Sequence, residues 1–401
     1  MGNNMKPLQG IRIADFTVHA AGPFCTHMLS QLGAECIKIE SLLRPDIFRK
    51  PHPVYGRLGA ATFDQAASNK LSVRVNLKHP KGVALAKRLV GISDIAAESF
   101  RPGVMDRLGL SYEALREARR DIIFVSVSSS GQTGPDSHFA GYAPLFGAWG
   151  GLGYLTGYAD GPPVEMRHVM DHSLGMNAAL ATVAAMLRRR ATGEPQRVDV
   201  AAREVAASFI GEALLQAAAG DKPVRSGNDH PAMAPHGVFP SKDYDRWVTI
   251  AVGSEMEWQG LIQSMQQTDI PNNPIYATQA SRCEHREELN DIISGWTKLQ
   301  DADKIVSLLQ SAGVPAHVSW NARDIVEDKH LRQRRAIVDV HEPGGNLRAA
   351  VGVPIRLSKS PDVGIEMGTP RLGEHEDYVF GELLGMAATE RRVLQDEQVI
   401  Y

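Results

Sequence analysis

Residues 8–40 have the pattern of a strand, a helix and a second strand, and this pattern restricts the fold more than any other feature of the chain. Apolar residues predict the first strand at 11–16, and Pro23 suits the first turn of a helix, where a missing N–H costs nothing. The helix is expected to end at Gly33, and the second strand is expected at 36–39. Such units build parallel sheets, including those that bind nucleotides. Because the unit lacks the sequence G-x-G-x-x-G, an oxidoreductase that uses a dinucleotide cofactor is disfavoured.

Strand and helix patterns alternate to about residue 130, for example a polar helix at 112–119 followed by an apolar strand at 122–127. This alternation predicts an α/β fold whose large domain has a Rossmann-like parallel sheet. Near residue 223 the composition changes: tryptophans cluster, and a strand is expected at 247–252. We therefore expect a smaller α+β domain there. The predicted boundaries are 1–222 together with 331–401 for the large domain, and 223–330 for the small one.

The composition describes an ordinary globular protein, with 401 residues of which 43% are hydrophobic and 22% charged. A formal charge of -3 provides no field to attract nucleic acid, and no apolar run approaches the length of a membrane span. Three distant cysteines without a C-x-x-C pattern (Cys25, Cys36 and Cys283) favour a reducing compartment, so we expect a cytoplasmic protein. No group of residues has metal-ligand spacing, and no metal is expected.

One carboxylate stands at the start of a predicted long helix. Asp171 precedes an apolar segment with helical recurrence, which closes on three arginines and stops at Gly193, as the helix dipole and C-cap preferences favour. A strand is expected at 197–200. An isolated acid at the mouth of a tightly packed helix suggests a nucleophile or a base. The alternative is that Asp171 serves only as an N-terminal cap, which is the more common role of such an acid.

Four further motifs stand apart along the chain. They are SNKLSVRVNLKHPKG at 68–82, ESFRPGVMDRLGL at 98–110, GNDHPAMAPHGVFPSKDYDRWVTIAV at 227–252 and RLGEH at 371–375. Together with residues 8–40 and the Asp171 helix, in this order, they resemble the class III CoA-transferase family. That family contains formyl-CoA transferase, carnitine CoA-transferase and α-methylacyl-CoA racemase. The resemblance extends from residue 8 to about residue 385. It implies an interlocked dimer, as a homodimer or a heteromer with a related subunit, and no cofactor besides coenzyme A as substrate and product.

The resemblance also implies a role for Asp171, which matches the acid of the family's D-x-x-x-G helix start. In the family this carboxylate attacks the thioester of an acyl-CoA and forms a mixed anhydride, then an aspartyl-CoA thioester that passes CoA to an acceptor acid. Covalent catalysis of this kind divides one difficult exchange into easier acyl transfers. The GN-x-HP-x-x-APHG pattern is similar to the branch that transfers CoA from succinyl-CoA to acids such as benzylsuccinate. An apolar, aromatic segment at 141–158 also suggests an aromatic acceptor.

The resemblance assigns two further sets of residues. Expected to bind CoA are His19, Ala20, Val75, Asn76, Leu77, Lys78, Ser99, Phe100, Pro102 and Arg107. Expected near the substrate are Tyr142, His172, His230 and His236. Because residues one and three positions from Asp171 project differently from a helix, at most one of His168 and His172 is expected to face its pocket.

Departures from the family pattern disfavour some of the reactions that the family catalyses. Ala20 stands where formyl-CoA transferase has a glutamine. Ser41 stands where that enzyme has a basic residue, whose role Arg44 or Arg49 would take in this chain. Formyl and oxalate substrates are therefore disfavoured. Tyr142 stands where the racemase has a histidine, and a phenol is a poor partner for proton exchange at neutral pH. The alternatives are a 2-methylacyl-CoA racemase or epimerase and a non-catalytic CoA-binding partner subunit. The second is disfavoured because Asp171 is present.

Overall fold

The computed structural model describes residues 5–50, 63–166, 168–266, 270, 273–341, 347–360 and 363–401. The chain divides into two compact units. Unit 1 comprises Met1–Gly153, Glu165–Asp221 and Asp328–Tyr401, and unit 2 comprises Tyr154–Val164 and Lys222–Glu327.

One segment, Tyr154–Val164, belongs to unit 2, whereas the boundaries expected from the sequence place it in the larger domain. The guanidinium of Arg225 holds it there. Arg225 donates hydrogen bonds to the carbonyl oxygens of Tyr154, Tyr158 and Gly161 and lies 5.3 Å from the ring centroid of Tyr154. A contact of this kind joins residues far apart in the sequence, so local composition does not reveal it.

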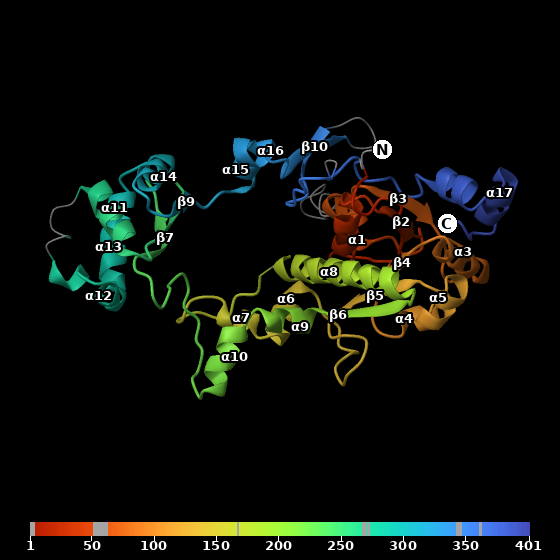
Figure 1. Cartoon of the computed structure of the whole chain (residues 1–401), viewed down its shortest axis with the longest axis horizontal. Helices are drawn as coiled ribbons and strands as arrows, with labels where there is room; N and C mark the ends of the chain where they lie inside the picture. The colour runs from red at the N-terminus through yellow and green to blue at the C-terminus, as the bar shows by residue number, and fades with distance from the viewer. Residues whose placement is uncertain are drawn as a thin grey trace. The chain divides into compact units, whose positions relative to one another are not determined.

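Within the described residues, unit 1 contains a parallel six-stranded sheet of order β3-β2-β1-β4-β5-β6 (Figure 1). Its strands are β1 (Arg12–Asp15), β2 (Glu35–Glu40), β3 (Lys70–Arg74), β4 (Ile95–Glu98), β5 (Ile123–Ser128) and β6 (Gln196–Ala201). This is the strand order of nucleotide-binding sheets, and it confirms the predicted α/β class. The order reverses between β1 and β4, and ligands of such sheets bind beyond the carboxyl ends of the strands at that point.

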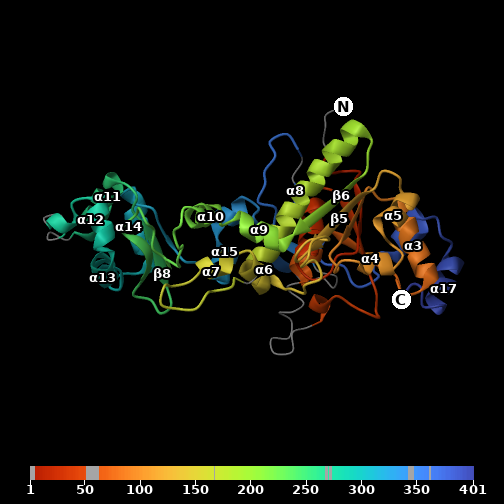
Figure 2. The same ribbon diagram turned by 90° about the horizontal axis from the view of Figure 1, so that it is seen from below.

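Two apolar cores cover the two faces of this sheet. One contains side chains of α1 (Ala21–Gln31) and α8 (Val169–Thr192), which pack on Ile13, Ile95 and Val125. In the ribbon views α8 lies beside β5 and β6 (Figures 1 and 2). The other contains side chains of α3 (Pro80–Gly91), α5 (Tyr112–Ala118) and the C-terminal segment. Because helices cover both faces, the strands are largely buried and most of their buried side chains are apolar.

The long helix α8 begins two residues before Asp171 and ends at Thr192. Arg189 and Arg190 occupy its last turn, and Gly193 follows with φ of 75°, the left-handed conformation that ends many helices. The predicted stop is therefore confirmed.

The remaining elements of unit 1 are shorter. They are η1 (Ile47–Arg49), α4 (Val104–Arg107), α6 (Ala143–Trp149), α9 (Ala202–Ser208), α10 (Gly211–Ala218), α16 (Lys329–Gln333), the hairpin β10 (Ile337–His341) and β11 (Leu347–Val351), the π-helical turn η3 (Asp377–Leu383) and α17 (Ala388–Asp396). The short helix α7 (Leu152–Leu155) crosses the first boundary between the units in the sequence.

Unit 2 has its own antiparallel sheet and its own core. The sheet has the order β7-β8-β9, and its core contains Val248, Trp258, Ile293 and Leu309. The elements are β7 (His236–Pro240), β8 (Trp247–Ala251), α11 (Glu255–Met265), η2 (Pro274–Tyr276), α12 (Gln279–Glu284), α13 (Arg286–Thr297), α14 (Ala302–Ser311), β9 (Ala316–Val318) and α15 (Ala322–Glu327). This arrangement confirms the smaller α+β part of the prediction.

A buried ion pair lies beneath the carboxyl ends of the first strands of unit 1. Lys70 donates hydrogen bonds to Asp15 at 3.0 Å and to the hydroxyl of Thr26 at 2.7 Å, and both charged side chains are fully buried. Burial acts to raise the pKa of Asp15, but the charges of Lys70 and Lys38 outweigh it and lower the pKa to about 2. Charged groups without contact to water need such pairing, because removing one partner leaves the other uncompensated.

We predict that Lys70→Met lowers the free energy of unfolding by about 3–5 kcal/mol at neutral pH, because Asp15 loses its nearest cation. The folded pKa of Asp15 lies below its ordinary value, so the pair stabilises the protein above about pH 3.8 and loses this effect as the pH falls toward about 2. The difference in the free energy of unfolding between wild type and variant should shrink over that range in chemical denaturation.

The control is Lys81→Met, which breaks an exposed pair with Glu397 and should cost less than about 1 kcal/mol. Equal losses for the two variants would contradict the prediction.

Candidate active site

Asp171 lies in the first turn of α8, where this helix packs closely against the start of α1. The closeness depends on Gly175: a Cβ atom there would lie 2.7 Å from the carbonyl oxygen of Ala21 and 3.0 Å from the ring of Phe24. Only glycine allows this approach without a shift of the backbone. The D-x-x-x-G spacing therefore places the acid one helical turn from the contact with α1.

The Asp171 carboxylate is half-buried, and this burial affects its pKa. Burial raises the pKa of Asp171, and the nearby imidazoles of His168, His172 and His19 act in the opposite direction. An acid that must act as an anion needs such compensation, because burial disfavours the charged form. The arrangement is a half-buried carboxylate with histidines around it.

Both His168 and His172 act to lower the pKa of Asp171, and the expectation that at most one of them faces its pocket stays a prediction. His168 precedes the helix in the left-handed conformation, with φ of 61°, and its side chain is exposed. The Nδ1 atom of His172 lies 2.7 Å from the carbonyl oxygen of His168 and must carry the proton, since a carbonyl only accepts. The ring of His172 also packs edge-on against Phe24, with 4.4 Å between centroids.

The loop between β1 and α1 runs through the switch point of the sheet, and its backbone is held from several sides. The N–H of Val18 donates to the hydroxyl of Ser99 at 2.9 Å, and that hydroxyl donates to the carbonyl oxygen of Val18 at 3.0 Å. Lys38 donates to the carbonyl oxygen of Thr17 at 2.8 Å, and the N–H of His19 donates to Asp46 at 3.1 Å. Ser99, predicted as a CoA ligand, thus uses its hydroxyl to join the loops after β1 and β4.

His19 ends this held stretch, and its ring contacts two aromatic rings. Phe48 and Tyr142 each contact it edge-on, at 6.2 Å between centroids. The next residue, Ala20, precedes the first turn of α1. The structure therefore brings His19 and Tyr142 together, and places His19 where its charge reaches Asp171.

The predicted CoA residues near β3 differ in what they offer a ligand. Val75 is buried in the core, and the amide of Asn76 donates to the carbonyl oxygen of Gln398 at 3.0 Å. Leu77 packs partly on the same core, whereas Lys78 is exposed. Only Lys78 of these four therefore presents a free polar side chain, at the end of an edge strand.

The second predicted group follows β4. Phe100 is half-buried against the core and Pro102 is half-buried in the same loop, while Arg107 is exposed on α4. Among the described residues, neither Arg107 nor Lys78 forms an ion pair, so both cations are free to bind phosphate. Arg49, considered as a basic substitute, is instead tied to Glu40 through two hydrogen bonds of 2.7 Å.

His230 and His236 lie in unit 2 and contact each other, with 5.4 Å between ring centroids. The Nδ1 atom of His230 accepts the N–H of Ala232, and the Nδ1 atom of His236 lies 2.7 Å from the carbonyl oxygen of Asn228. Each ring is thus oriented by its own loop. Their role toward a substrate stays a prediction.

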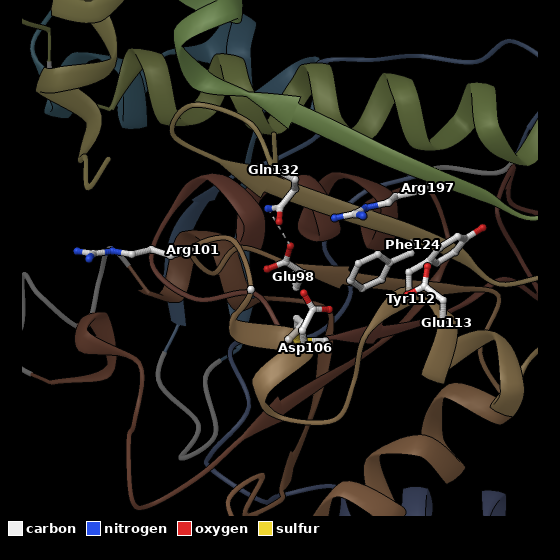
Figure 3. A pocket seen from close by; sticks show the side chains of 10 residues that line it. Glu98, Arg101, Asp106, Tyr112, Glu113, Phe124, Gln132 and Arg197 are labelled. Carbon is white, nitrogen blue, oxygen red and sulfur yellow. Dashed lines mark hydrogen bonds between the residues drawn. The ribbon is translucent and has the colours of Figure 1, made fainter. Parts of the chain in front are cut away.

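A cavity of about 110 Å³ opens beside the loop after β4 (Figure 3). Its lining includes Glu98, Gln132 and Arg197, and Gln132 points toward the Glu98 carboxylate. Burial raises the pKa of Glu98 to about 7, although the N–H of Phe100 donates to it at 2.7 Å. Phe124, which also lines the cavity, faces the α3 and α5 side of the sheet. The cavity is therefore separate from the surroundings of Asp171.

Three residues that hold the loop after β1 were not predicted from the sequence: Lys38, Asp46 and Lys70. A lysine inside an otherwise apolar strand pattern, as at Lys38, signals a buried ion pair, but it does not identify the partner. In the described part of the chain no group of three or more His, Cys, Asp or Glu side chains could hold a metal ion, and no helix there is long and apolar enough to cross a membrane.

Comparison with known proteins identifies the family. The sequence model of CoA-transferase family III matches residues 8–376. A succinyl-CoA–D-citramalate CoA-transferase of Chloroflexus aurantiacus is 34% identical over 403 residues, with 98% of each chain covered. The beta subunit of a succinyl-CoA–L-malate CoA-transferase from the same organism is 31% identical, again with 98% of each covered. A CAIB/BAIF family protein from Brucella suis has a solved structure with a TM-score of 0.86 and 28% identity, covering 94% of this chain and 99% of that one. The chain therefore belongs to CoA-transferase family III and is an enzyme of that family.

Proposed function

We propose that this enzyme transfers CoA from succinyl-CoA to a dicarboxylic acid through covalent intermediates on Asp171. The observation that carries the proposal is a half-buried carboxylate in the first turn of α8, with three imidazoles acting on its charge. The substrates in the names of two relatives support the donor and the acceptor class, since citramalate and malate are both dicarboxylic acids. The aromatic acceptor suggested by the sequence, benzylsuccinate, is also a dicarboxylic acid.

The proposed reaction begins when a carboxylate oxygen of Asp171 attacks the thioester carbonyl carbon. The C–S bond breaks, CoA leaves as a thiolate, and an anhydride joins Asp171 to the succinyl group. The thiolate then attacks the aspartyl carbonyl, which releases succinate and leaves an aspartyl-CoA thioester. The acceptor carboxylate repeats the two steps in reverse order, so that CoA ends on the acceptor and Asp171 is free again. No proton is gained or lost, and each step is an acyl transfer.

This chemistry requires Asp171 to be ionised when the donor binds. Burial strengthens a carboxylate as a nucleophile because fewer water molecules must be removed, but it also disfavours the anion. The imidazoles of His168, His172 and His19 act against this effect, although the pKa of Asp171 stays raised. No cofactor is needed, because coenzyme A itself is the group that moves.

The switch point of the sheet is the proposed seat of CoA. The loops after β1 and β4 meet there through Ser99 and Val18. Lys78 and Arg107 are exposed cations without ion-pair partners in the described residues, which suits them to phosphate. The thioester end would then extend toward His19, Ala20 and Asp171.

We predict that Asp171→Ala lowers kcat for CoA transfer from succinyl-CoA by several orders of magnitude, on the order of 10⁴, because the covalent path is lost. Thermal unfolding should change little, since the side chain makes no hydrogen bond within the described residues. Turnover would be followed as CoA esters of a dicarboxylic acid panel, by mass spectrometry. The matched control is Asp303→Ala, which removes an exposed acid from the first turn of α14. Near-normal turnover in Asp171→Ala would exclude the proposed nucleophile.

A racemase is the second candidate, because the structure places imidazoles near Asp171 although Tyr142 occupies the expected position of the racemase histidine. The two reactions separate in deuterated water. We expect no deuterium at the α-carbon of a 2-methylacyl-CoA without an acceptor acid, and net turnover only when an acceptor is present. Acceptor-independent α-deuteration at the rate of turnover would assign the enzyme to the racemase branch.

We also propose that the enzyme works as a dimer, either of identical chains or with a related subunit. On α8 the exposed apolar side chains Met176, Leu180 and Leu187 form one stripe, and no residue of α10 is buried. Apolar surface of this extent usually marks an interface. A relative named as a beta subunit supports the hetero-oligomeric form. Light scattering of the purified chain should give about twice 43.6 kDa, and a stable monomer at micromolar concentration would contradict the homodimer.

A further inference from the structure

We propose that His19 binds the distal carboxylate of the dicarboxylic acyl group while its other end is joined to Asp171, and that Asp46 is the positioning residue for His19. This inference rests on the proposed function, because it concerns the same acyl group. It assigns the selection of dicarboxylic over monocarboxylic acyl groups to one residue of the loop after β1.

A dicarboxylic acyl group brings a second negative charge into the site. In a succinyl group this carboxylate is separated from the reacting carbonyl by only two methylene groups, so it must lie close to the half-buried Asp171. An anion removed from water needs a cation or hydrogen-bond donors to replace its hydration. The charged groups that act on Asp171 in the described residues are imidazoles, those of His168, His172 and His19. One of them is therefore the expected partner of the distal carboxylate.

His19 fits this role better than the other two. The Nδ1 proton of His172 is already donated to the carbonyl oxygen of His168, and its ring is packed on Phe24. His168 is exposed at the start of the helix. By contrast, no described residue bonds to the ring nitrogens of His19, while Phe48 and Tyr142 each contact the ring edge-on. A donor that is fixed in place and has no other partner binds an anion with little loss of freedom.

Asp46 explains how the ring of His19 is held. Its Oδ2 atom accepts the N–H of His19 at 3.1 Å, and its Oδ1 atom accepts the N–H of Phe48 at 3.0 Å. One buried carboxylate thus joins the backbones of the two residues whose rings touch. Lys38, at 3.8 Å, balances its charge.

The backbone of His19 needs this support, because its φ of 67° lies in the left-handed region. A residue with a side chain adopts that conformation only where its surroundings hold it there. The hydrogen bond to Asp46 and the pair of bonds between Val18 and Ser99 provide the hold.

The test compares succinyl-CoA with butyryl-CoA, which has the same number of carbons and lacks the distal carboxylate. For wild type and His19→Ala, kcat/KM would be measured for each donor with one fixed acceptor. We expect the ratio of succinyl-CoA to butyryl-CoA to fall by roughly tenfold to a hundredfold in the variant, as for the loss of one hydrogen bond to a charged group. His19→Gln keeps an N–H donor without the imidazole, and its ratio should lie between those of wild type and His19→Ala. Asp46→Ala should shift the ratio in the same direction.

The control is His330→Ala, an exposed histidine of α16, which should leave the ratio at the wild-type value. An unchanged ratio in His19→Ala would overturn the inference. If kcat/KM stays at the wild-type level for both donors, His19 does not contact the distal carboxylate. If kcat/KM falls equally for both donors, His19 has a structural role. Neither result would touch the proposed function, because wild-type transfer from succinyl-CoA is measured in the same experiment. If wild type itself transfers no CoA from succinyl-CoA, the proposed function fails and the inference falls with it.

Discussion

Buried charges hold the loop after β1 in place, and the geometry of the site depends on them. Lys70 and Lys38 enter the interior from neighbouring strands and meet Asp15, Asp46 and the backbone of Thr17. Ion pairs without contact to water are weak as net sources of stability, but they tolerate little displacement because a separated charge is costly. These contacts hold the loop at the point where the strand order reverses.

Asp171, the proposed nucleophile, is brought near this loop by α8. α8 approaches α1 closely because Gly175 leaves room for the backbone of Ala21. Asp171 then lies one helical turn from this contact and is half-buried, and the imidazole of His19 acts to lower its pKa. In unit 1 a helix therefore carries Asp171, the loop after β1 carries His19, and Lys78 and Arg107 are exposed after β3 and on α4.

Much of this arrangement was predictable from the sequence, and the failures have a common origin. The parallel sheet and the α8 helix follow from local patterns, because apolar periodicity and the stop at Gly193 lie within short windows. The approach of Asp46 to His19 was not predictable, since it joins residues 27 positions apart through a backbone hydrogen bond. Placement of Tyr154–Val164 depended on Arg225, far along the chain.

The central claim is that Asp171 becomes covalently linked to CoA during turnover. Intact-protein and peptide mass spectrometry after mixing the enzyme with succinyl-CoA, without an acceptor, tests it most directly. The account predicts a mass increase corresponding to a CoA thioester, located on the peptide that contains Asp171, and its disappearance when an acceptor acid is added. Hydroxylamine should convert the same residue to a hydroxamate. Turnover without any adduct on that peptide, or an adduct on another residue that exchanges at the rate of turnover, would contradict the account.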